Sequence, residues 1–158
     1  MMRKDKKRFK VAMIGHKRVP SREGGIEVVV EELSVRMVER GLKVDVYNRK
    51  DRFGKAYKQP REYKGIRIIQ IPTFKVSALN AFVYSVLASF RALFGGYDCI
   101  HYHAEGPCAM MWLPKLFGIH TVATIHGLDW QRAKWGGFST KYLKLGEKCA
   151  SKYADELI

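Results

Sequence analysis

The residues that follow the N-terminal tail form one complete strand–helix–strand pattern, which restricts the fold more than any other feature. The apolar run Val11–Ile14 is followed by a polar loop that ends at Gly24 and Gly25. Beyond these glycines, apolar residues recur at the spacing of one helix face, until Gly41 ends the pattern. The alternating apolar residues of 42–46 follow at once. Such a βαβ unit predicts a right-handed parallel crossover.

The rest of the chain continues the alternation of strands and helices. The expected strands are residues 66–71, 99–103 and 120–125, and the expected helices are residues 77–94, 108–116 and about 139–153. Helix 77–94 has a wide apolar face, made of Leu79, Phe82, Val83, Val86, Leu87, Phe90, Leu93 and Phe94. We expect this face to be largely buried, or else to lie on another apolar surface. The alternation predicts an α/β fold, a Rossmann-like doubly wound parallel sheet.

The length of 158 residues, with 47% hydrophobic residues, suits a single domain over 1–158. The last residues, Glu156–Ile158, resemble the opening of a further strand, so we expect a longer parent protein. Three cysteines without paired spacing favour a reducing, cytosolic compartment. The sequence shows no signal peptide, and residues 76–95 contain too many polar residues for a membrane-spanning helix.

The formal net charge of +14 predicts an anionic partner. Nucleic acid, an acidic lipid surface and phosphorylated small molecules all qualify. Basic residues concentrate in segments 1–10 and 49–64, which are either solvated or in contact with a membrane surface. They do not lie along a recognition helix or among stacking aromatic residues, which disfavours nucleic acid as the partner.

Ligands of an open parallel sheet bind beyond the carboxyl ends of its strands. The loops expected there contain His16, Arg18, Arg22, Glu23, Gly24 and Gly25, then His103, Glu105 and Gly106, then His126, Gly127, Asp129 and Arg132. Two glycines before a helix suit the close approach of a phosphate, although they also serve simply to turn the chain. The fingerprints of dinucleotide-binding proteins and of P-loop NTPases are absent from the sequence.

Three histidines of these segments raise the question of a metal site. His101 and His103 point to the same face of their strand, and His126 follows the next one. We expect no metal here, because His101 should lie deeper in the sheet and no carboxylate is placed to support the ligands. Hydrogen-bonded structural histidines are the alternative, but two histidines at adjacent strand ends favour a functional site.

Three segments together resemble the N-terminal domain of family 4 glycosyltransferases, which are retaining enzymes of the GT-B architecture. They are GGIEVVVEELSVRMVERGLKVDVYNR, DCIHYHAEGP and TVATIHGLDWQRAKWGGFSTKYLKLGEKCASKYADELI. The resemblance is greatest to the bacterial branch that builds cell-surface polysaccharides, including rhamnosyltransferases and other hexosyltransferases. It implies a parent with two halves: this acceptor-side half, and a C-terminal half that binds the nucleotide-sugar donor. The chain alone would then be inactive.

The resemblance also implies roles for individual residues. The expected catalytic residues are His103, His126 and Asp129, and the expected donor-binding residues are Gly24, Gly25, Arg22, Glu105 and Arg132. The segment that matches the family's His-Glu-Pro motif reads His-Ala-Glu-Gly-Pro here, which leaves the role of Glu105 open. Glycine amides and basic side chains can stabilise a diphosphate leaving group, so neither a metal nor a cofactor is expected beyond the nucleotide-diphosphate sugar.

The function implied is transfer of a hexosyl group to a glycan or to an acceptor linked to polyprenyl diphosphate. This places the enzyme in the cytoplasm, with peripheral association at the anionic inner face of the membrane. The alternatives are a basic nucleic-acid-binding module and a non-catalytic Rossmann-like module. A dehydrogenase is disfavoured, because Asn48 and Arg49 stand where an acidic strand end would be expected.

Overall fold

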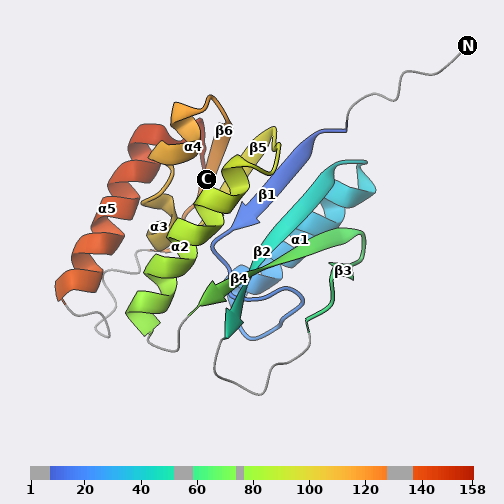
Figure 1. Ribbon diagram of the computed structural model, residues 1–158, viewed down its shortest axis with the longest axis horizontal. Helices are drawn as coiled ribbons and strands as arrows, with labels where there is room; N and C mark the ends of the chain where they lie inside the picture. The colour runs from blue at the N-terminus through green and yellow to red at the C-terminus, as the bar shows by residue number, and fades with distance from the viewer. Residues whose placement is uncertain (1–7, 52–58, 74–76, 128–136) are drawn as a thin grey trace, which may run out of the picture.

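The computed structural model describes residues 8–51, 59–73, 77–127 and 137–158. Within these ranges a seven-stranded sheet has the order β3-β4-β2-β1-β5-β6-β7 (Figure 1). The strands are β1 (Lys10–Ile14), β2 (Lys43–Asp51), β3 (Glu62–Tyr63), β4 (Ile66–Thr73), β5 (Cys99–His103), β6 (His120–Thr124) and β7 (Glu156–Leu157). All neighbouring strands are parallel except the short β3, which pairs antiparallel with β4. The predicted α/β fold with a parallel sheet is confirmed.

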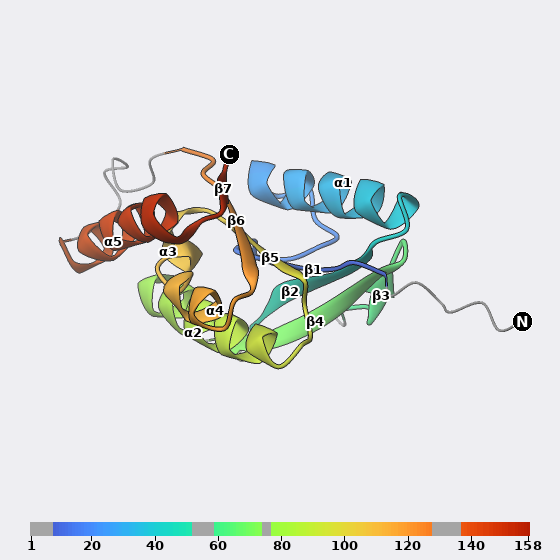
Figure 2. The ribbon, with the colours of Figure 1, turned by 90° about the horizontal axis from the view of Figure 1, so that it is seen from above.

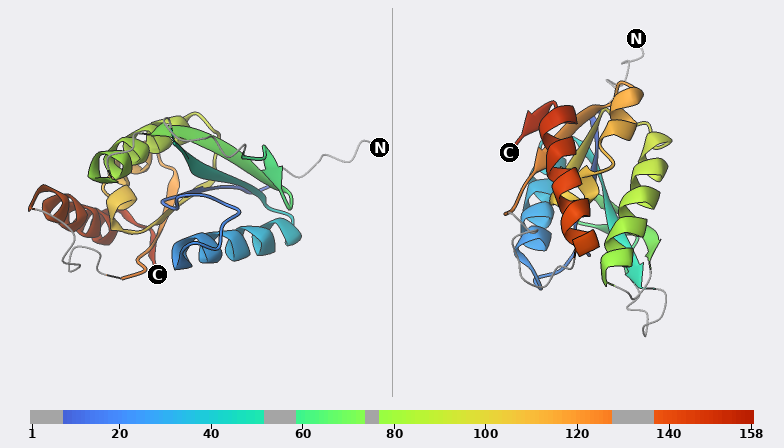
Figure 3. Two further views of the ribbon diagram at one scale, coloured as in Figure 1. Left: turned by 90° about the horizontal axis from the view of Figure 1, so that it is seen from below. Right: turned by 90° about the vertical axis from the view of Figure 1, so that its left-hand side faces the viewer.

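Helices cover both faces of the sheet (Figures 2 and 3). They are α1 (Gly25–Glu39), α2 (Ser77–Leu93), α3 (Glu105–Cys108), α4 (Trp112–Leu116) and α5 (Gly137–Tyr153). One face packs against α1 and the other against α2, α3, α4 and α5. Strand β1 contributes to both cores: Val11 and Met13 pack with the α1 side, whereas Ala12 and Ile14 pack with the α2 side.

The segment predicted as one helix over residues 108–116 forms two short helices instead. Helix α3 begins earlier, at Glu105, and ends at Cys108, whereas α4 begins at Trp112. Pro114 explains the break, because proline lacks an N–H and its ring clashes with the carbonyl four residues earlier in a continuous helix. In the observed arrangement Pro114 lies in the first turn of α4, where helices tolerate proline.

Helix α2 packs on the sheet through a face that the sequence did not predict. Five of the large apolar side chains expected to be buried are between 39% and 87% exposed: Leu79, Phe82, Leu87, Phe90 and Phe94. The buried positions are Tyr84, Ser85, Ala88, Ser89 and Ala92. Four of these five are small, which lets the helix lie close to the sheet. Among the described residues, no helix is both long and apolar enough to cross a bilayer.

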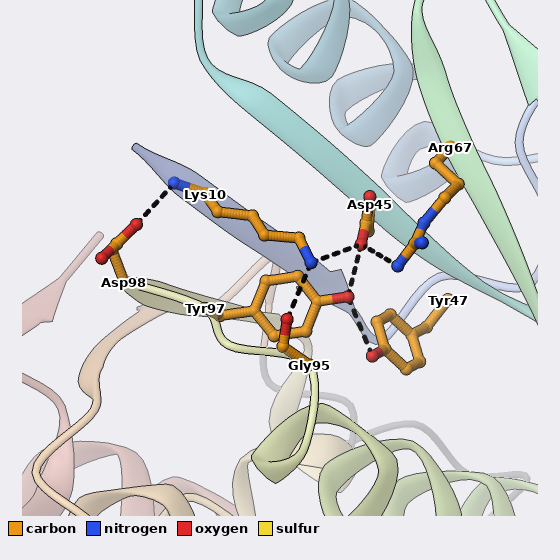
Figure 4. A network of polar contacts seen from close by, with 7 residues as sticks. All are labelled: Lys10, Asp45, Tyr47, Arg67, Gly95, Tyr97 and Asp98. Carbon is orange, nitrogen blue, oxygen red and sulfur yellow. Dashed lines mark hydrogen bonds and ion pairs between the residues drawn. The ribbon is translucent and has the colours of Figure 1, made fainter. Parts of the chain in front are cut away.

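A partly buried polar network joins the strands at the end of the sheet where β1 begins (Figure 4). The Asp45 carboxylate accepts hydrogen bonds from the Tyr97 hydroxyl and from the Arg67 guanidinium, both at 2.6 Å. Lys10 Nζ lies 3.5 Å from the same carboxylate and donates to the Gly95 carbonyl at 2.7 Å. The network therefore ties β1, β2 and β4 to the turn between α2 and β5.

Candidate functional site

The candidate site lies at the carboxyl ends of β1, β5 and β6. From β1 the chain passes to β2 and then β4 on one side of the sheet, and it returns to β5 on the other side. The order of strands therefore reverses between β1 and β5. Ligands of open α/β sheets bind beyond the strand ends at such a reversal.

Gly15 brings the end of β1 into backbone contact with the end of β5. Its φ is +128°, and a Cβ atom there would lie 1.9 Å from the His103 carbonyl oxygen. From the sequence alone, Gly15 only marks the end of the apolar run Val11–Ile14. The signal available was a glycine between a fully apolar run and a polar loop, which is typical of close approach at a strand end.

Residue 104, next to His103, has a strained backbone. Ala104 has φ 71° and ψ 158°, a conformation that residues other than glycine rarely adopt. Its N–H donates to the Thr124 carbonyl at 3.0 Å, which fixes the end of β5 against β6. Strain of this kind collects at functional sites, where the surrounding structure enforces it. It marks the chain beside His103 as part of such a site.

The structure brings His103 and His126 together, as the sequence predicted. His103 Nδ1 lies 3.1 Å from His126 Nε2, and the two rings are stacked with centroids 5.4 Å apart. His101 also stacks on His103, with ring centroids 4.2 Å apart, and its Nε2 lies 2.8 Å from Thr124 Oγ1. Three imidazoles, two from β5 and one from the loop after β6, thus stack on one another.

A fourth imidazole, His16, belongs to the same cluster. It is fully buried, and its Nε2 lies 2.9 Å from Asn48 Oδ1 on β2. Burial lowers the pKa of His16 and of His101 to about 4. The pKa of His103 lies well below its ordinary value. Burial is the main cause, and the nearby histidines 101, 16 and 126 lower this pKa further. These three rings are therefore neutral at neutral pH and act as hydrogen-bonding groups rather than as cations.

The described residues contain no group of three or more His, Cys, Asp or Glu side chains arranged to hold a metal ion. The cluster nevertheless offers several ring nitrogens at one rim. Its chemistry suits neutral polar groups such as hydroxyls, which both donate and accept hydrogen bonds.

The two glycines expected to approach a phosphate differ in their surroundings. Gly24 is the N-cap of α1, and a Cβ atom there would lie 2.2 Å from Glu27 Oε2. Gly25 is open, since a Cβ atom would meet nothing within 4 Å. Glu27 also accepts the Lys17 N–H at 3.0 Å. The role of Glu27 was missed in the sequence, and it restricts an anion to the Gly25 side of the helix end.

Arg22, expected to bind the donor, lies against α1 rather than beside the histidines. Its guanidinium is 3.2 Å from Glu31 and 3.7 Å from Glu32. Glu31 is buried and also accepts a hydrogen bond from the Tyr63 hydroxyl at 3.1 Å. The arginine therefore serves an ion-pair cluster on α1 in this structure.

Three predicted site residues remain: Glu105, which is buried, and Asp129 and Arg132, which the structure does not describe. Glu105 is fully buried in α3, where Gly146 of α5 packs so closely that a Cβ atom would lie 1.8 Å from the Glu105 carbonyl oxygen. Glu105 is thus part of the packing between α3 and α5. Asp129 and Arg132 lie outside the described residues, and their roles stay predictions.

Comparison with known proteins decides the family. Residues 23–158 match the sequence model of Glycosyltransferase Family 4. The chain belongs to this glycosyltransferase family. It is 30% identical over 126 residues to the D-inositol 3-phosphate glycosyltransferase of Thermobifida fusca. That match covers 67% of this chain and 28% of the relative.

A solved structure supports the fold of this family 4 chain. The sucrose-phosphate synthase of Thermosynechococcus elongatus superposes with a TM-score of 0.66 at 19% identity, over 95% of this chain and 42% of the synthase. Together with the family match, the parallel sheet and the flanking helices, this supports a Rossmann-like N-terminal domain of the GT-B type. The chain spans less than half the length of both proteins.

Proposed function

We propose that the chain is the acceptor-side half of a longer enzyme that makes cell-surface polysaccharide. This enzyme transfers a rhamnosyl or other hexosyl group from a nucleotide-diphosphate sugar to a glycan or to a lipid-linked acceptor. The observation that carries the proposal is the meeting of Gly15, His103 and His126 at the strand reversal of a family 4 chain. Because the relatives are more than twice as long, the chain alone is expected to be inactive.

The arrangement supports different roles for two parts of the site: the amino end of α1 binds the diphosphate leaving group, and His103 binds the reacting sugar. Negative charge develops on the diphosphate as the bond to the sugar breaks. The amino end of α1, open at Gly25, offers backbone N–H groups and the positive end of the helix dipole. The neutral imidazole of His103 then contributes hydrogen bonds to the reacting sugar rather than charge. Asp129 and Arg132 are proposed to complete the site from the loop after β6.

Exposed apolar residues favour an acceptor at a lipid surface. Phe90 of α2 and Phe94, which directly follows that helix, are exposed, and so are Leu116 and Phe117 at the end of the adjacent α4. The only charged residue of α2 is Arg91, and the neighbouring α5 carries four lysines and a single glutamate. An apolar surface with basic residues on the same and neighbouring helices suits the anionic cytoplasmic leaflet of a membrane. Contact there would bring the enzyme to an acceptor linked to polyprenyl diphosphate.

A transfer assay with the longer enzyme tests the proposed function. The enzyme is incubated with radiolabelled UDP-glucose, UDP-galactose, GDP-mannose or dTDP-rhamnose, together with lipids extracted from bacterial membranes. The proposal predicts that label from at least one donor enters the lipid or glycan fraction. Labelled sugar recovered only as free donor, with every donor, would contradict it.

A further inference from the structure

His16 carries a buried nitrogen that has no hydrogen-bond partner among the described residues. The residue lies two positions beyond the end of β1, at the reversal of strand order, and its side chain is fully buried. Its Nε2 is bonded to Asn48, but its Nδ1 has no partner in the described part of the chain. Buried polar atoms of native proteins are almost always paired, so such an atom indicates a missing ligand group or an internal water.

The partners of Asn48 fix which nitrogen of His16 carries the proton. Asn48 Nδ2 donates to the Val19 carbonyl and to Gln59 Oε1, both at 2.8 Å, and Asn48 Oδ1 accepts the Val19 N–H at 3.0 Å. The oxygen of the amide therefore faces His16 and can only accept. It follows that His16 Nε2 bears the hydrogen and that Nδ1 presents a lone pair.

A lone pair at Nδ1 selects one kind of ligand group. It accepts a hydrogen bond from a hydroxyl, but it repels an ionised phosphate oxygen, because both are acceptors. Burial keeps the ring neutral at neutral pH, so the nitrogen stays an acceptor there. The position is thus suited to the hydroxyl-bearing part of a sugar nucleotide or of a glycan, and not to its phosphates.

A second unpartnered nitrogen lies on the neighbouring strand. His103 Nε2 is buried and has no hydrogen-bond partner within the described residues. His16 is close enough to His103 to contribute to lowering its pKa, and Gly15 contacts the His103 carbonyl. Two unsatisfied ring nitrogens therefore come from the ends of β1 and β5, the two strands between which ligands are expected.

We infer that His16 is a sugar-binding residue whose Nδ1 accepts a hydrogen bond from a sugar hydroxyl, and that Asn48 is the positioning residue that fixes its tautomer. The inference rests on the proposed transferase function, and it assigns hydroxyl groups and phosphate to different parts of the site. Hydroxyl groups bind between β1 and β5, and phosphate binds at the Gly25 end of α1. Because the His16 side chain is fully buried in this structure, sugar binding requires a local rearrangement that uncovers Nδ1.

Heteronuclear NMR of the chain labelled at histidine nitrogens tests both parts. Without ligand, His16 should show hydrogen on Nε2 and none on Nδ1. Addition of D-glucose, D-galactose or L-rhamnose, each as a separate probe, should shift the Nδ1 resonance, whereas inorganic phosphate should not. A proton on Nδ1 would overturn the assignment. An Nδ1 signal insensitive to all three sugars would overturn sugar binding, and this is the result expected if an internal water is the partner.

Two variants of similar size separate binding from folding. In His16→Gln the terminal amide can still donate to Asn48, but the acceptor at the δ position is lost. In His16→Asn an oxygen replaces Nδ1, and the bond to Asn48 is lost. We expect sugar affinity to fall about tenfold in His16→Gln and to change less in His16→Asn, for variants whose backbone spectra remain native. Equal affinity in His16→Gln and the unaltered chain would contradict the inference.

The outcome is independent of the transfer assay. Sugar-dependent shifts at His16 would support the sugar site even if no donor in that assay reacted. Successful transfer by the longer enzyme, together with a His16 that does not respond to sugar, would refute the role of His16 alone.

Discussion

At the scale of single residues, Gly15 controls the shape of the site. Gly15→Ala would place a methyl group 1.9 Å from the His103 carbonyl oxygen, at a φ of +128°. We expect the free energy of unfolding to fall by about 2–4 kcal/mol, from steric overlap and backbone strain together. Urea denaturation measures this change. Gly25→Ala is the matched control, because its methyl group would meet nothing within 4 Å, and it should be neutral or slightly stabilising. Equal effects of the two changes would contradict the close approach.

The buried histidines predict how stability depends on pH. The pKa of His16 and of His101 is about 4 in the folded chain and 6.5 in the unfolded reference. The unfolded chain therefore binds more protons between these values, and stability should be lost as pH falls from about 6.5 to about 4. One such shift corresponds to roughly 3 kcal/mol. Denaturation at several pH values measures the slope. It should become shallower in His101→Gln but not in His120→Gln, whose side chain is half exposed.

Which side chains contact one another at the candidate site was only partly predictable from the sequence. His103 and His126 were identified because each follows a strand, and parallel strand ends meet at one edge. The hydrogen bond between His16 and Asn48 was not predicted. It joins residues 32 positions apart and depends on how the side chains at the ends of β1 and β2 are oriented. The contact of Glu27 with Lys17 depends in the same way on how the loop folds back on α1.

At the scale of elements, α2 shows where hydrophobic periodicity misleads. Its large apolar side chains occur around most of the helix, so their number did not identify the buried face. The informative signal was the spacing of small residues at Ser85, Ala88, Ser89 and Ala92, which allows close packing on the sheet. The face opposite the sheet is therefore the one with exposed Phe90.

The exposed face of α2 gives a test of membrane contact. The double change Phe90→Ser and Phe94→Ser removes two exposed aromatic rings and should leave the fold intact. We expect sedimentation with vesicles containing phosphatidylglycerol to fall several-fold at low salt, because apolar burial and charge act together. Val29→Ser is the control, since Val29 is exposed on α1 at the other face of the sheet. The proposal fails if the unaltered chain does not bind, or if the control loses binding equally.

The network at Asp45 predicts how strands β1, β2 and β4 are held together. Asp45→Asn removes the carboxylate shared by Arg67, Tyr97 and Lys10. The expected loss in unfolding free energy is about 2–3 kcal/mol, less than for a fully buried pair because Arg67 is partly exposed. Thermal or urea denaturation measures it. Glu23→Gln, which removes the surface pair with Arg18, should cost at most about 1 kcal/mol. Comparable losses would show that the network is not stabilising.

At the scale of the whole molecule, strand–helix alternation was enough to predict the parallel sheet and the edge at which the candidate site lies. Short connections and right-handed crossovers leave few arrangements for such a pattern, and the histidine-bearing ends then share one edge. The sequence did not reveal the antiparallel β3, which has only two residues, or the division of α3 from α4. Both depend on local details that periodicity does not contain.

The central claim is that the edge formed by β1, β5 and β6 is the reaction site of a longer glycosyltransferase. The most direct test is kcat of that enzyme with His103→Ala, measured beside His120→Ala, a histidine at the opposite end of β6. The account predicts that kcat falls about 100-fold in the first variant and stays near the unaltered value in the second, with both proteins folded. An unchanged kcat in His103→Ala would contradict it.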